Sequence, residues 1–145
     1  MKLLTKKPHL FFFGGIPVFL LLGFLKKDIP IAIEISYINY LLNVDFWCYV
    51  SAIYFGLIGV NYLALDWANK TPKKLLTILH ILLQTLALIP YLYAILHLDS
   101  QGVLEQKELL GFNLNALFLM AILLFLGSIV LHLTNFLISF FLKTE

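Results

Sequence analysis

The sequence predicts an all-α integral membrane protein, a four-helix bundle that forms one transmembrane domain over residues 1–145. Hydrophobic residues make up 61% of the chain, and charged residues only 12%, about half of the roughly 25% found in soluble domains. Four apolar stretches are each long enough to cross a bilayer, because a helix of about 20 residues spans its hydrocarbon core. These stretches are 10–25, 46–65, 75–97 and 112–142.

The first stretch resembles a signal peptide, because lysines precede its apolar run. It lacks the small-x-small cleavage site of such peptides, and Lys26, Lys27 and Asp28 follow it instead. We therefore expect a retained first helix. The segment 28–44 comes next and is the longest loop. Alternation of apolar and polar residues over 31–36 is typical of a short strand, although a segment lying along the membrane interface fits it equally.

The second stretch carries a stripe of small residues, Cys48, Ala52, Gly56 and Gly59, at spacings of 4, 4 and 3. Small residues on one helix face allow another backbone to approach closely. This small-residue stripe predicts packing within the bundle, or else a contact surface for a partner protein. Cys48 is the one cysteine of the chain, so it cannot form an internal disulfide, and we expect it to serve in packing.

The third and fourth stretches each carry a polar face. The members are Thr77, His80 and Gln84, with Ala87, in the third stretch, and Ser128, His132, Asn135 and Ser139 in the fourth. Each set recurs at helical spacing, and polar groups in hydrocarbon need partners. The two faces are therefore predicted to face each other. Depth counted from the helix ends predicts that His80 lies near Asn135 and Gln84 near His132.

The two histidines inside the bilayer, His80 and His132, are the candidate cofactor-binding residues. They could form hydrogen bonds that hold the bundle together, bind a b-type haem, or take part in proton or quinone chemistry. Their counted depths differ by about one helical turn, roughly 6 Å, which is unfavourable for shared haem ligation. No acidic or basic residue lies deep in any stretch, which weakens the proton relay. The chain has no glycine-rich phosphate loop and no Cys/His cluster, so we expect no catalytic residue, no metal site and no obligatory cofactor.

The lysines predict an orientation. Seven of the ten lie at the N-terminus, between the second and third stretches, or in the C-terminal tail. The positive-inside rule then places both termini in the cytoplasm, with the chain in the cell inner membrane. Trp47 and Trp67, near opposite ends of the second stretch, are positioned as interfacial anchors. The net charge of +2 gives no indication of a nucleic-acid partner.

The order of these features resembles the last four helices of subunit I of the haem-copper terminal oxidases. The segment 27–38 is similar to an outside loop of that family, with Tyr37 matching its tyrosine and Ser36 standing in place of its threonine. The opening of the third stretch, 74–81, resembles the family's Lys-Ile-His-Phe opening and places His80 at that histidine. The resemblance implies a shared fold and a docking surface.

The haem-ligating His-x-His pair of that family corresponds to residues 42–44, where this chain has Leu42, Asn43 and Val44. Oxygen reduction by this chain alone is therefore excluded by the number of ligands. The opening 7–13 is similar to that of short stand-alone chains of this four-helix kind.

We therefore expect a non-catalytic small membrane protein, an accessory or assembly component of a larger membrane complex, of which a respiratory complex is one candidate. Its partners would be the lipid bilayer and other membrane subunits or a second copy of the chain. One alternative is a haem-binding or electron-transfer protein that uses His80 and His132, and a second is a small oligomeric transporter or channel.

Overall fold

The computed structural model describes residues 7–35, 38–97, 108–109 and 112–141. Over these residues the chain forms four long helices, each long and apolar enough to span a membrane. They are α2 (Pro8–Leu25), α3 (Val44–Trp67), α4 (Lys74–His97) and α5 (Leu114–Phe141). The predicted all-α four-helix class is confirmed, and the chain is a multi-pass membrane protein.

The predicted helix boundaries are correct to within two residues. α2 begins at Pro8 rather than at residue 10, because a proline is accommodated in the first turn, where its missing N–H has no acceptor to lose. α3 extends beyond 46–65 at both ends. α5 begins two residues later than 112, because Phe112–Asn113 forms a short strand, β4, that pairs with β3 (Glu108–Leu109).

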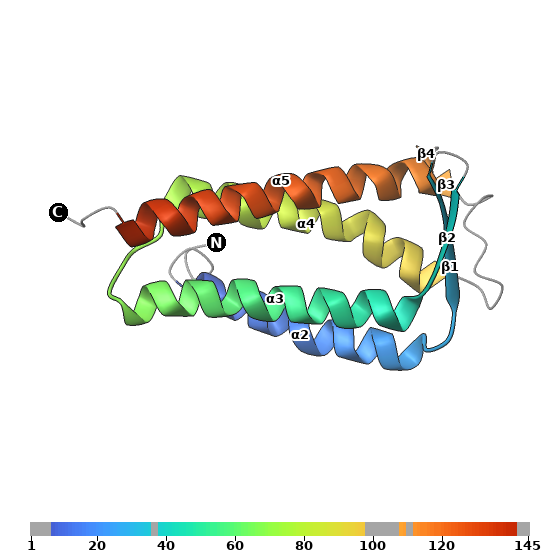
Figure 1. Ribbon diagram of the computed structural model, residues 1–145, viewed down its shortest axis with the longest axis horizontal. Helices are drawn as coiled ribbons and strands as arrows, with labels where there is room; N and C mark the ends of the chain where they lie inside the picture. The colour runs from blue at the N-terminus through green and yellow to red at the C-terminus, as the bar shows by residue number, and fades with distance from the viewer. Residues whose placement is uncertain (1–6, 36–37, 98–107, 110–111, 142–145) are drawn as a thin grey trace.

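A β-hairpin connects α2 to α3. Strand β1 (Pro30–Ile35) pairs with β2 (Ile38–Asn43) in antiparallel register, from Pro30 opposite Asn43 to Ile35 opposite Ile38. Of the two structures that the alternation over 31–36 left open, a strand is observed over Pro30–Ile35, while residue 36 lies outside the described residues. The partner strand was not predicted. β2 leads directly into α3, so the hairpin lies at one end of the bundle (Figure 1).

The helices form two antiparallel pairs, α2 with α3 and α4 with α5 (Figure 1). α2 begins, and α5 ends, at the end of the bundle opposite the β1–β2 hairpin. This arrangement agrees with the expectation that both termini lie on one side of the membrane. Their cytoplasmic location remains a prediction from the lysine distribution.

α3 ends in a helix-terminating motif in which asparagine occupies the position that glycine usually takes. Asn69 adopts a left-handed backbone with φ of 53°, a conformation that asparagine tolerates better than most residues. The Lys70 N–H then donates to the carbonyl of Leu65 at 2.8 Å, and the Asn69 N–H to that of Asp66 at 3.0 Å. These two bonds are the Schellman pattern, which satisfies carbonyls left over at a helix end. The turn redirects the chain into α4.

The small-residue stripe of α3 packs against α2. A Cβ placed on Gly59 would lie 2.6 Å from Cε1 of Phe13, and one placed on Gly23 would lie 3.2 Å from Cβ of Cys48. Cys48 and Ala52 are buried. The stripe therefore serves mainly to bring the α2 and α3 backbones together. Gly56 is half-buried, and its nearest neighbour would be Ile16 Cδ1 at 3.7 Å.

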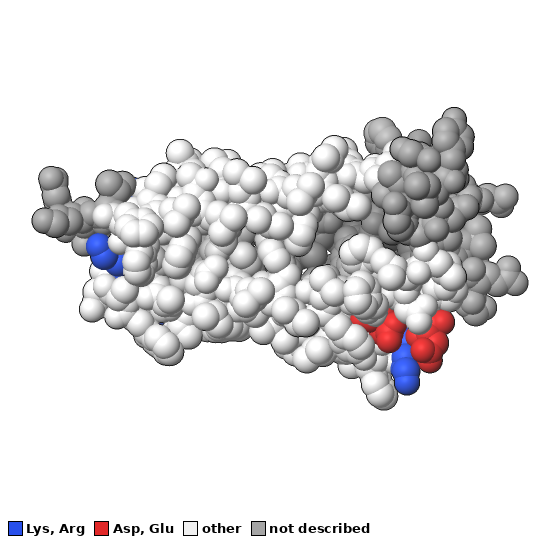
Figure 2. All heavy atoms as spheres, viewed as in Figure 1, with Lys and Arg blue, Asp and Glu red and all other residues white. Residues whose placement is uncertain are grey.

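Charged side chains lie at the two ends of the molecule. Figure 2 shows lysines at both ends of this face and acidic residues only at the end that carries the β1–β2 hairpin, with no described charged residue on the surface between them. Trp67 is 77% exposed at one end of α3, as expected of an interfacial anchor. Trp47 differs from that expectation, because it packs against buried Val44, Cys48 and Ile95 inside the bundle.

Candidate functional site

A layer of polar side chains lies in the interior of the bundle, between α3, α4 and α5. On the α4–α5 interface its members are fully or almost fully buried: Thr77, His80 and Gln84 of α4, and Ser128, His132, Asn135 and Ser139 of α5. These are the residues of the two predicted polar faces. The prediction that the faces lie against each other is confirmed by direct hydrogen bonds between them.

The observed pairing is one helical turn away from the predicted one. Asn135 Nδ2 donates to Thr77 Oγ1 at 2.9 Å, and the ring of His132 lies beside that of His80, with centroids 4.9 Å apart. Gln84 bonds to Ser128. The predicted pairs of His80 with Asn135 and of Gln84 with His132 therefore do not form. The prediction assumed that α4 and α5 end at the same depth. α5 has 28 residues against 24 for α4, and its last residues continue beyond the start of α4, so the count from the helix ends gave the wrong register.

Asn135 fixes this register by capping α4 from the neighbouring helix. Its Oδ1 accepts a hydrogen bond of 2.9 Å from the backbone N–H of Lys73, the residue that precedes α4. Backbone N–H groups at a helix start have no acceptor within the helix. The Thr77 hydroxyl donates to the Lys73 carbonyl at 3.1 Å, and Ser139 donates to Asn135 at 3.4 Å. One asparagine therefore ties the end of α5 to the start of α4.

The two histidines are each held by a side chain of α3. Nδ1 of His80 is 2.9 Å from the hydroxyl of Tyr62. The Asn61 amide donates to Nε2 of His132 at 3.1 Å. Neutral His132 then carries its proton on Nδ1. Among the described residues, His80 Nε2 and His132 Nδ1 are buried without a hydrogen-bond partner.

Aromatic rings surround the histidine pair. Phe12 of α2 stacks on His80 with a centroid separation of 5.0 Å and an interplanar angle of 14°. Tyr62 meets His132 edge to face at 5.0 Å. All four helices therefore contribute side chains to the histidine pair. The sequence had predicted contributions from α4 and α5 alone.

The histidine pair was tested for its fit to a haem. Metal–imidazole bonds of about 2 Å place two axial nitrogens roughly 4 Å apart and the ring centroids roughly 6 Å apart, with the porphyrin plane between them. The observed centroid separation is 4.9 Å, and the rings are inclined by 38°. His80 and His132 are thus brought together, but this arrangement does not fit a haem held between them. Within the described part of the chain, no group of three or more His, Cys, Asp or Glu residues could hold a metal ion.

Gln84 connects the polar layer to a cavity. Its Oε1 accepts hydrogen bonds from Ser128 at 2.9 Å and from Tyr54 at 3.2 Å. Its Nε2 is buried and has no acceptor among the described residues. A buried donor without a partner costs about 1–3 kcal/mol, so this amide is held in an unfavourable state by its neighbours.

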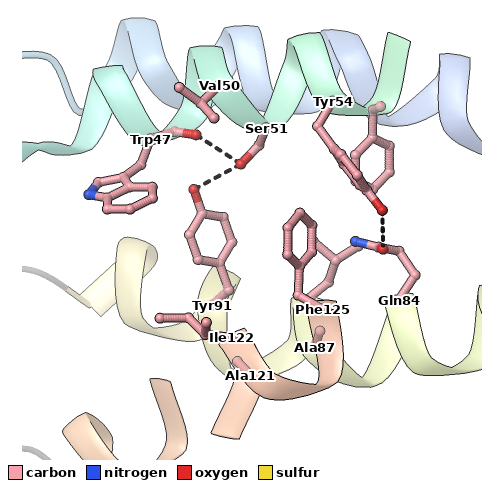
Figure 3. Close-up of a pocket in the computed structure, with 12 residues that line it drawn as sticks. Trp47, Val50, Ser51, Tyr54, Gln84, Ala87, Tyr91, Ala121, Ile122 and Phe125 are labelled. Carbon is pink, nitrogen blue, oxygen red and sulfur yellow. Dashed lines mark hydrogen bonds between the residues drawn. The ribbon is translucent and has the colours of Figure 1, made fainter. Parts of the chain in front are cut away.

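The cavity has a volume of about 130 Å³ and lies between α3, α4 and α5 (Figure 3). Its walls include Trp47, Tyr54, Phe125 and Tyr91. Tyr91 is held by a hydrogen bond of 3.1 Å between its hydroxyl and that of Ser51. Among the residues that the structure describes, no charged side chain and no histidine lines it.

The sequence identifies a second face of α3 and offers a bond within the bundle as one option for Asn61, but it does not link that face to the histidines or to a cavity. Trp47, Tyr54 and Asn61 recur at a spacing of seven, which places them on one face of a helix. Two of them line the cavity, and the third holds His132. Tyr62 does not belong to this series. Only its residue type could have indicated a hydrogen bond, because a buried tyrosine hydroxyl needs a partner.

Comparison of the chain with known protein families, with curated proteins and with solved structures finds no match.

Proposed function

We propose that the chain is a non-catalytic accessory or assembly component of a larger complex in the inner membrane, with a respiratory complex as the first candidate. The observation that carries this proposal is the use of its buried polar groups. Thr77, Ser128 and Asn135 bond one another's helices, Gln84 or nearby backbone, and within the described part of the chain no group of three or more His, Cys, Asp or Glu residues could hold a metal ion. Such an interior holds helices in register, as expected of a scaffold.

The outward surface is compatible with the same proposal. Large apolar side chains are exposed along α3 and α5, among them Ile53, Leu57, Leu123 and Val130. In a membrane such a surface suits lipid chains and the helices of another subunit equally. None of the described residues that line the cavity is charged, so the cavity does not favour the alternative of an ion-conducting transporter or channel.

The proposal is tested on a native gel. The tagged full-length chain, expressed in its own membrane and extracted with digitonin, is compared with recombinant chain purified alone in the same detergent. We expect the native chain to migrate in a much larger species, and we expect its removal to lower the amount of the assembled complex. Identical migration of the two samples, with unchanged levels of respiratory complexes, would contradict the proposal.

Two matched variants locate the contact surface. Leu57→Trp enlarges the outward face of α3, and Leu123→Trp enlarges that of α5, and both positions are more than half exposed. Neither change touches the interior, so both variants should fold. We expect one of them to release the chain from the large species while the other leaves it bound. If both remain bound, the contact lies elsewhere and the hairpin end is examined next.

The haem alternative has its own measurement. The absorption spectrum of gently solubilised protein is recorded oxidised and after reduction with dithionite. Because the histidine rings are 4.9 Å apart, we expect no reduced-minus-oxidised α band. A band that disappears in His80→Ala would make this chain a haem protein and would require the two rings to separate.

A further inference from the structure

The cavity beside Gln84 is accessible from the side of the bundle. Figure 2 shows a hollow between the positions of α3 and α5 in Figure 1, and none of the described residues beside it is charged. Gln84 lies near the middle of α4, and the other lining residues come from the halves of α3, α4 and α5 nearer the hairpins, including Ser51, Ala87 and Ala121. A molecule dissolved in the bilayer can therefore reach this cavity without passing through water.

The size and the walls of the cavity suit one flat ring. A volume of about 130 Å³ is close to that of a protein cavity of about 150 Å³ that takes up benzene. Tyr54, Phe125 and Tyr91 project into the space from three different helices (Figure 3). Aromatic side chains bind flat rings through offset or edge-to-face contacts. Because none of the described lining residues is charged, the cavity favours a neutral ligand.

The polar requirement of the cavity is a hydrogen-bond acceptor. Hydroxyls of Tyr54 and Ser128 both donate to Oε1 of Gln84, which leaves its NH₂ group as the donor in need of a partner. Figure 3 shows this nitrogen on the cavity side of the amide, next to Phe125. The indole N–H of Trp47 is also buried and has no acceptor among the described residues, but it points away from the other lining residues.

We propose that this cavity binds the ring of a lipid-soluble quinone, with a ring carbonyl accepting a hydrogen bond from Nε2 of Gln84. A quinone ring is flat, neutral and soluble in the bilayer, and its carbonyl oxygen is the acceptor that the amide lacks. An acyl chain would fill the space but leave the amide without a partner. Binding here does not depend on the chain being an accessory subunit.

The binding test uses the fluorescence of Trp47. The chain has two tryptophans, and Trp67→Phe leaves Trp47, in the cavity wall, as the only reporter. The variant is placed in lipid nanodiscs and titrated with 2,5-dimethyl-1,4-benzoquinone. We expect saturable quenching. The isosteric 1,2,4,5-tetramethylbenzene, in which methyl groups replace both carbonyls, should compete only at roughly tenfold higher concentration, because it cannot accept a hydrogen bond.

One matched pair of variants and one single substitution separate a bound quinone from one that is only dissolved in the bilayer. Ala121→Phe fills the cavity and should abolish the saturable component, whereas Ala116→Phe, at an exposed position on the same helix, should preserve it. Gln84→Met removes the amide at similar size and should weaken quinone binding about tenfold, without changing the affinity for the hydrocarbon. If Gln84→Met fails to fold, the alanine pair still decides.

Two results would overturn the proposal. Quenching that rises linearly with quinone and is equal in Ala121→Phe would mean that the quinone only partitions into the bilayer. Equal affinity for the quinone and the hydrocarbon would mean that the cavity accepts any apolar group, such as a lipid chain. Neither result bears on the native-gel test of the accessory role.

Discussion

The two helix pairs of this bundle are held together by different interactions. α2 and α3 meet through glycines and aromatic rings, with Gly15 against Phe55 and Gly59 against Phe13. α4 and α5 meet through hydrogen bonds between buried side chains, such as Asn135 to Thr77. In a membrane, apolar surface gains nothing by leaving lipid for another helix, so association depends on close packing or on polar bonds. In this chain close packing joins α2 to α3, and polar bonds join α4 to α5.

The difference has a consequence for tolerance to change. Close packing fails when volume is added, because a buried ring has nowhere to move. A hydrogen-bonded interface fails when a partner is removed, because the remaining polar group stays buried and unpaired. Substitutions of opposite kinds should therefore be most damaging in the two pairs.

The largest effect is expected from Gly15→Leu in α2. A side chain at this position would run into the ring of Phe55, which is itself buried in the core between α2 and α3. We expect a loss of about 3 kcal/mol in the free energy of unfolding, measured by titration with SDS in mixed micelles. The matched control is Gly14→Leu, since a Cβ there meets nothing within 4 Å. A similar loss in both variants would mean that the glycines act through backbone freedom rather than through contact.

The next effect is expected from Asn135→Ala in the α4–α5 pair. This change leaves the Lys73 N–H and the Thr77 hydroxyl without their partner on α5. We expect a loss of about 2 kcal/mol in the same titration. The neighbouring Thr134→Ala serves as control, because Thr134 is exposed and its hydroxyl bonds the Val130 carbonyl of its own helix. If the two alanine variants are equally stable, Asn135 does not set the register.

The sequence predicted which faces of α4 and α5 meet, but not the register in which they meet. Helical spacing identified the polar faces of α4 and α5, because the period of a helix is fixed by its backbone. It could not identify the register, since sliding one helix by a turn keeps the same faces in contact. The register is set by the hydrogen bond from the Lys73 N–H to Asn135, and this N–H belongs to neither polar face.

The contribution of α3 shows a second limit of sequence reasoning. The side chains that hold the histidines, Asn61 and Tyr62, belong to a helix whose clearest pattern is its small-residue stripe. That stripe was correctly identified as a packing surface, but it faces α2. The cavity could not be predicted, because it is space left between three helices and has no pattern of its own in the sequence.

A smaller effect is expected from Tyr62→Phe, because Tyr62 takes part in both kinds of interface. Tyr62 lies in the aromatic core between α2 and α3, and its hydroxyl bonds His80 of α4. Because the ring is kept, only the hydrogen bond is lost, and we expect a cost of about 1 kcal/mol. Combining this change with His80→Phe in a double-mutant cycle should give a coupling of about 0.6 kcal/mol, the average for such bonds in membranes. Zero coupling would assign Tyr62 to packing alone. Tyr49→Phe, at an exposed position of α3, is the control.

The smallest effect is expected from Gly56→Ala, and it sharpens the account of the small-residue stripe. The added methyl would lie 3.7 Å from Ile16 Cδ1, an ordinary contact, whereas the same change at Gly59 would place it 2.6 Å from the Phe13 ring. We expect Gly56→Ala to alter the free energy of unfolding by about 0.5 kcal/mol or less, and Gly59→Ala to cost about 2 kcal/mol. Migration of the Gly56→Ala variant on a native gel should match that of the original chain. A changed assembly state at unchanged stability would show that this half-buried glycine touches another protein. In that case the stripe would serve two surfaces, α2 on one side and a partner on the other.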